Sequence, residues 1–222
     1  MLAGLGGFYT LRLVKGTARR FSMKREDHFT RLLLLAGFIP LPVFLLGMGV
    51  AGLFTPDYSW LAQHASELSI VPGLSKILFK LVAVLIGLAF MAFGVGLMRM
   101  TGARCVGAIC WVLFGMAMCS NGVWPMGSPM HGLYALPLVS LIAPALALAE
   151  SDELRAMKGM WGVTVIVSLC GLFYLWLNLL GMDPQAYRGL TQRLFSSINS
   201  LWPACVAWYI LARTAQARSP GA

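Results

Sequence analysis

The sequence predicts an all-α polytopic membrane protein, a bundle of six transmembrane helices. Hydrophobic residues make up 59% of the 222 residues and charged residues only 11%, compared with about half and about a quarter in soluble domains. Six apolar runs each approach the roughly 20 residues that cross a hydrocarbon core of about 30 Å. Only helices satisfy every backbone group in such runs, because the short alternating strands of a membrane barrel do not occur here.

The apolar runs form a transmembrane domain, residues 32–212, between an N-terminal arm (1–31) and a tail (213–222). In the arm, apolar residues recur at helical spacing opposite basic ones, which is typical of an amphipathic helix on an anionic membrane surface. Arg19-Arg20 resembles a twin-arginine export signal, but no cleavage site follows, and a start at Met23 is a better-supported alternative. The predicted spans are Leu32–Phe54, Ile77–Leu97, Cys105–Val123, Leu133–Ala149, Met160–Leu180 and Leu190–Ala212.

Lysine and arginine are distributed unequally between the two sides that these spans define. Thirteen lie in the arm, the second and fourth loops and the tail, and four on the other side. The positive-inside rule therefore predicts cytoplasmic termini and a multi-pass protein of a bacterial or archaeal inner membrane. On this assignment the acids Glu150, Asp152 and Glu153 lie in an inner turn beside Arg155 and Lys158, where solvated loop charge is the simplest interpretation.

Composition and motifs argue against several functional classes. The net charge of +9 does not indicate a nucleic-acid partner, because the basic residues flank apolar runs and form no isolated patch. The five cysteines lie in or beside apolar runs without a CxxC pair, so we expect buried apolar thiols with no metal or disulfide. No Walker loop, GxSxG elbow or dinucleotide fingerprint occurs in a meaningful context, and no cofactor is expected.

The segment from Tyr58 to Ser69 is the place where ionisable residues gather between two apolar runs. As a helix it would place Trp60, His64 and Glu67 on one face and leucines and alanine on another. Asp57 or Ser59 would cap its start and Pro72-Gly73 would end it. The pattern predicts a short amphipathic helix on the outer membrane surface.

Two further polar groups are predicted at the outer face. One comprises Asn121, Ser128 and His131, and the other two stripes at the start of the last span: Gln192, Ser196 and Asn199, and Arg193, Ser197 and Ser200. A helix with this many polar groups should face protein or water. Arg193 either reaches the headgroups or pairs with Glu67 or Asp183, and the polar neighbours favour pairing.

Short motifs carry a family resemblance. A Ser-Glu-Leu box follows the first span (Ser66-Glu67-Leu68), His131-Gly132 opens the fourth, and Arg193 precedes Trp202 in the last. The chain from Leu32 to Ala212 thereby resembles a family of six-span prokaryotic membrane proteins, domain of unknown function 998 (DUF998). The resemblance implies the fold and topology and supplies no reaction.

Three functions remain open. The favoured one is non-enzymatic: an outward-facing pocket that binds a lipid- or isoprenoid-like amphipathic ligand, or a membrane partner protein or second copy. Its predicted ligand-binding residues are Trp60, His64, Glu67, Asn121, His131, Arg193, Ser197, Asn199 and Ser200. The alternative is a membrane enzyme that uses His64, Glu67 and His131 on a lipid or envelope intermediate. A small transporter ranks third, because no charged residue lies at mid-membrane in the first five spans.

Overall fold

The computed structural model describes residues 28–133 and 135–217, and every regular element in these residues is a helix. Most of the predicted arm and the last five residues of the tail lie outside this part of the chain. Five helices are long and apolar enough to cross a membrane. Large apolar side chains cover the outside of the bundle, as on Ile166, Phe173 and Leu179 of one helix, each at least 60% exposed. The chain is therefore a multi-pass membrane protein.

The first span, His28–Leu53, changes helix type along its length. It comprises α1 (His28–Leu35), the 3₁₀ turn η1 (Ala36–Phe38), α2 (Pro40–Pro42), the π-helical turn η2 (Val43–Gly47) and α3 (Met48–Leu53). Pro40 and Pro42 lack the N–H groups that an α-helix needs there, so the chain tightens before them and widens after them. These two prolines thus alter the helix locally without ending it.

The second and third spans are α4 (Leu74–Thr101) and α5 (Val106–Val123). They pack closely because glycines face each other: a Cβ added to Gly87 would lie 2.5 Å from Cys119 Sγ, and one on Gly115 would lie 2.6 Å from the Gly87 carbonyl. Such close approach is typical of small residues at helix contacts in membrane proteins.

The fourth predicted span is much shorter as a helix than expected. After η4 (His131–Leu133) and η5 (Leu136–Leu138), α6 (Val139–Glu150) has only 12 residues. Together η5 and α6 reach about 22 Å, short of a hydrocarbon core of about 30 Å. The backbone explains the late start, because Gly132 and Leu133 have positive φ values of 68° and 46° and Pro137 follows. The prediction of a helix from Leu133 is wrong for its first residues.

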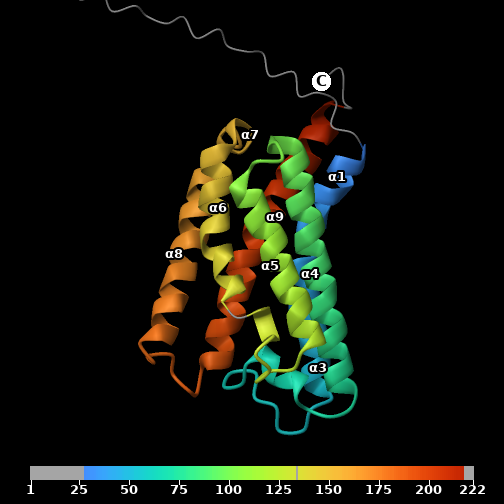
Figure 1. The fold of residues 1–222 in the computed structure, drawn as a ribbon, viewed down its shortest axis with the longest axis vertical. Helices are drawn as coiled ribbons and strands as arrows, with labels where there is room; N and C mark the ends of the chain where they lie inside the picture. The colour runs from blue at the N-terminus through green and yellow to red at the C-terminus, as the bar shows by residue number, and fades with distance from the viewer. Residues whose placement is uncertain (1–27, 134, 218–222) are drawn as a thin grey trace, which may run out of the picture.

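The remaining helices are α7 (Asp152–Arg155), α8 (Met160–Leu179) and α9 (Arg188–Ala217). Each long helix packs against its successor, and α9 also contacts the first span, which closes the bundle. The described termini lie at one end, called here the α7 end, with the 102–105 and 151–159 connections; the loops 54–73, 124–138 and 180–187 lie at the opposite, η3 end (Figure 1).

Aromatic side chains fill the centre of the bundle. Trp111 of α5 and Trp202 of α9 are fully buried and stack with ring centroids 5.5 Å apart, while Phe93 of α4 meets both edge-on. The Trp202 indole N–H donates to Thr164 Oγ1 of α8 at 2.9 Å. These contacts fix α9 against three other helices and thereby position its polar start at the η3 end.

Candidate functional site

The loop between the first span and α4 is mostly non-helical. Only η3 (Ala65–Ser69), a 3₁₀ helix, is regular, so the prediction of a helix from Tyr58 is wrong for residues 58–64. The physical reason is competition for backbone carbonyls. The Leu61 carbonyl accepts from the Leu190 N–H at 3.0 Å, and the Ala62 carbonyl accepts from Arg188 Nε at 2.9 Å. These carbonyls are therefore bonded to α9 and not to a helix of the loop.

Arg193 of α9 stabilises this loop. Its Nη1 donates to the carbonyls of Trp60, Gln63 and Gly189 at 2.7, 2.9 and 2.7 Å, and its Nη2 donates to Tyr58 Oη at 2.6 Å. The guanidinium carbon also lies 4.9 Å from the centroid of the Trp60 ring. Arg193 therefore binds backbone carbonyls and aromatic rings, and the predicted pairing with Glu67 or Asp183 is wrong.

Glu67 pairs instead with Arg188, the first residue of α9, at 3.2 Å. The Glu67 carboxylate also accepts from the His64 N–H at 2.9 Å and from Gln63 Nε2 at 3.3 Å. His64, and neither Asp57 nor Ser59, is the N-cap of the helix that contains Glu67. The sequence contained a signal for Arg188, because it lies four residues before Gln192 and extends the polar stripe of α9 by one turn.

Gln192 and Gly189 complete the contact between the loop and α9. Gln192 Oε1 accepts from the Ala65 N–H at 2.7 Å, which satisfies a backbone donor at the start of η3. A Cβ on Gly189 would lie only 2.3 Å from the Gln63 carbonyl oxygen. The loop and α9 consequently meet backbone to backbone, and only glycine fits at this position.

The His64 ring lies among the charged residues that join the loop to α9, and one of its nitrogens has no hydrogen-bond partner. The ring is half-buried, and Nε2 is buried with no hydrogen bond. Burial lowers the His64 pKa, and the positive charge of Arg188 lowers it further. The imidazole is thus neutral near pH 7 and presents an unused nitrogen. The charges that act on it are those of Arg188, Glu67, Asp183 and Arg193.

Asp183, in the loop before α9, has a similarly unused atom. Its Oδ1 accepts from Thr191 Oγ1 at 2.8 Å, whereas Oδ2 is buried and has no partner. The His64 cluster, defined here as His64, Glu67, Asp183, Arg188 and Arg193, therefore contains two carboxylates, two guanidiniums and one neutral imidazole. Buried polar atoms without partners are rare in folded proteins and require an explanation.

The second predicted group lies in the last turn of α5 and in the loop that follows it. His131 Nδ1 is 2.9 Å from the Trp124 carbonyl oxygen, and Asn121 Oδ1 is buried without a partner. This loop contacts η3 through Ser69 Oγ, which accepts from the Met126 N–H at 2.8 Å. Within the residues that the structure describes, no hydrogen bond joins His131 to the His64 cluster.

Further along α9, the predicted polar stripes enter the protein interior. Asn199 and Ser200 are 3% and 5% exposed, and with Ser196 they line a small cavity of about 40 Å³ between α9, the first span, α4 and α5. The sequence predicted that this helix face contacts protein or water, and Asn199 and Ser200 contact protein. Ser197 is partly buried and does not line this cavity.

The described part of the chain contains no cluster of side chains suited to bind a metal ion. No three His, Cys, Asp or Glu side chains gather there as a group that could hold a metal ion. The five cysteines are free thiols, of which Cys105 and Cys110 are buried.

The family can now be decided from the whole chain. The sequence profile described as "Protein of unknown function (DUF998)" matches residues 11–209. The protein belongs to the DUF998 family. This DUF998 match begins within the segment before Leu32, which the motif resemblance had left out. Comparison of this DUF998 protein with curated proteins and with solved structures gives no match.

Proposed function

We propose that this DUF998 protein crosses a prokaryotic inner membrane six times and binds the polar head of an amphipathic, lipid- or isoprenoid-like ligand at the η3 end. The thirteen-to-four distribution of Lys and Arg supports placing both termini in the cytoplasm and the η3 end outside. On this proposal α6 is the fourth span, and the membrane thins locally around it.

The observation that carries the binding proposal is the presence of three buried, unpartnered atoms in the His64 cluster: His64 Nε2, Asp183 Oδ2 and Arg193 Nε. An unsatisfied buried polar atom costs about 1–3 kcal/mol, and a bound polar group removes that cost. A ligand hydroxyl can donate to Asp183 Oδ2, and a ligand hydroxyl or phosphate oxygen can accept from the Arg193 Nε–H.

The surroundings of the cluster support an amphipathic ligand. Leu61, Ile70 and Leu190, on the loop and the start of α9, are 49%, 56% and 38% exposed. A polar head in the cluster would therefore have apolar surface beside it for a hydrocarbon chain.

Two of the predicted ligand-binding residues act within the protein itself. Glu67, through Arg188, and Arg193, through loop carbonyls and Tyr58, fix the loop on α9. Of the other predicted ligand-binding residues, Trp60 lies against Arg193 of the cluster. The proposed headgroup site does not include Asn121, His131, Ser197, Asn199 or Ser200. An enzyme remains the second candidate on one observation: a neutral imidazole with a free nitrogen is the form a general base requires.

Native mass spectrometry of the purified protein tests the proposal. We expect a co-purified lipid or isoprenoid mass that is strongly reduced in two variants. His64→Ala removes the unpartnered Nε2, and Asp183→Asn removes the charge of the carboxylate that holds the unpartnered Oδ2. His28→Ala, an exposed histidine in α1 at the opposite end, is the matched control and should retain the ligand. Equal occupancy in all four proteins would refute a site at the His64 cluster.

A further inference from the structure

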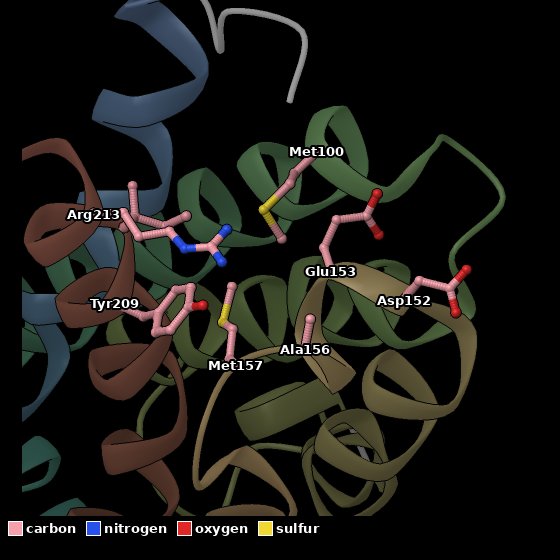
Figure 2. Close-up of a pocket in the computed structure, with 8 residues that line it drawn as sticks. Met100, Asp152, Glu153, Ala156, Met157, Tyr209 and Arg213 are labelled. Atoms are coloured by element: carbon pink, nitrogen blue, oxygen red, sulfur yellow. The ribbon is translucent and has the colours of Figure 1, made fainter. Parts of the chain in front are cut away.

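A cavity of about 280 Å³ lies at the α7 end, between α4, α7 and α9. Its apolar walls include Met100, Met157 and Ile210, and its charged residues include Glu153 and Arg213. Figure 2 shows the Arg213 guanidinium and the Glu153 side chain on either side of the two methionines. The volume equals roughly nine water molecules at about 30 Å³ each, which suits an organic group better than a single ion.

The charges around this cavity are not all neutralised by one another. Asp152, which also lines it, forms an ion pair with Arg155 of the same short helix. Glu153 accepts a hydrogen bond from Ser151 Oγ at 2.9 Å, and Arg213 lies over the Tyr209 ring at 4.7 Å. Within the described residues neither Glu153 nor Arg213 forms an ion pair, so the cavity presents one uncompensated negative and one uncompensated positive group.

We propose that this cavity binds an amine–phosphate zwitterion, the headgroup of an aminophospholipid such as phosphatidylethanolamine. The phosphate contacts Arg213, whose guanidinium suits phosphate oxygens. The ammonium contacts Glu153, and the methionines and Ile210 contact the first apolar atoms of the lipid. A zwitterion is favoured over an anionic lipid because the two free charges sum to zero.

The source of the headgroup is a membrane lipid, because the cavity lies at one end of a membrane bundle beside apolar surface. Trp208, next to Tyr209 on α9, is 65% exposed, so a lipid chain has an apolar helix surface to follow. The site is at the opposite end from the His64 cluster, and neither proposal depends on the other.

The test measures lipid binding to the full-length protein in detergent by native mass spectrometry, with phosphatidylethanolamine and phosphatidylglycerol of identical chains. A hydrogen bond to a charged group corresponds to about tenfold in affinity or more. We therefore expect phosphatidylethanolamine to bind about tenfold more tightly. Glu153→Gln should abolish this preference, whereas Arg213→Gln should weaken both lipids.

Two further variants make the result specific. Lys158→Gln removes a positive charge at the same end from a residue that does not line this cavity, and it should change neither affinity. Ala156→Phe fills the cavity from an exposed position without altering charge, and it should weaken both lipids.

Four outcomes of the lipid-binding measurements would overturn the proposal. These are equal affinity of the wild-type protein for the two lipids, a preference that survives Glu153→Gln, a loss in Lys158→Gln as large as in Arg213→Gln, or unchanged binding in Ala156→Phe. Free phosphoethanolamine is the probe for a soluble source. If it competes as well as the lipid does, the occupant is a soluble zwitterion and the lipid assignment fails.

Discussion

The partner of Glu67 gives the sharpest test of how the loop is fixed on α9. The structure pairs Glu67 with Arg188 at 3.2 Å and directs Arg193 to carbonyls and to Tyr58. Two double-mutant cycles, each combining Glu67→Gln with Arg188→Gln or Arg193→Gln, separate these roles. We expect a coupling free energy of about 0.5–1 kcal/mol for Glu67 with Arg188, because the Arg188 side chain is 44% exposed and solvent screens the pair.

Among the single variants, Arg193→Gln should lower the free energy of unfolding more than Arg188→Gln does, although Arg193 should couple less strongly to Glu67. Arg193 forms four hydrogen bonds at roughly 1 kcal/mol each, and its contact with the Trp60 ring adds about 0.5–1 kcal/mol. Arg193→Gln should therefore cost about 3–5 kcal/mol, while Arg188→Gln should cost about 1 kcal/mol after screening.

The measurement is the free energy of unfolding in mixed detergent micelles, for each single and double variant. The coupling of Glu67 with Arg193 should be smaller than that with Arg188, because within the described residues they meet only through Gln63, to which both hydrogen-bond. A coupling of Glu67 with Arg193 that exceeds its coupling with Arg188 would refute the arrangement described here.

Three further predictions follow from named contacts. Because the folded-state pKa of His64 is lowered, the unfolded chain binds more protons below about pH 6.5, so stability should fall as pH decreases from 7 to 5, and His64→Gln should flatten that dependence in thermal melts. Gly189→Ala should destabilise the protein by about 2 kcal/mol or more, because its Cβ would meet a loop carbonyl oxygen at 2.3 Å, whereas Gly162→Ala, with open space around it, should not. Reporter fusions at Ala62 and Asp152 should score outside and cytoplasmic respectively, and the same side for both would exclude the proposed topology.

Most of the helical framework follows from the sequence alone. The predicted runs Cys105–Val123 and Met160–Leu180 correspond to α5 (Val106–Val123) and α8 (Met160–Leu179) within one residue at each end. Such agreement has a physical cause, because a long apolar segment in lipid has only its own backbone to satisfy its hydrogen bonds. The glycine contacts of α4 with α5 were predictable for a related reason, since small residues permit close helix approach.

The polar ends of the bundle were decided by tertiary contacts. Residues 58–64 have a helical pattern, yet their carbonyls accept hydrogen bonds from side chains and backbone more than 120 positions away in the chain, and a local pattern contains no information about those donors. Glu153 and Arg213 likewise read as separate loop and tail charges until the folded bundle places them around one cavity. Lipid exposure makes helix formation a local necessity, whereas the partners of each polar side chain depend on which helix ends meet, and only the tertiary structure determines that.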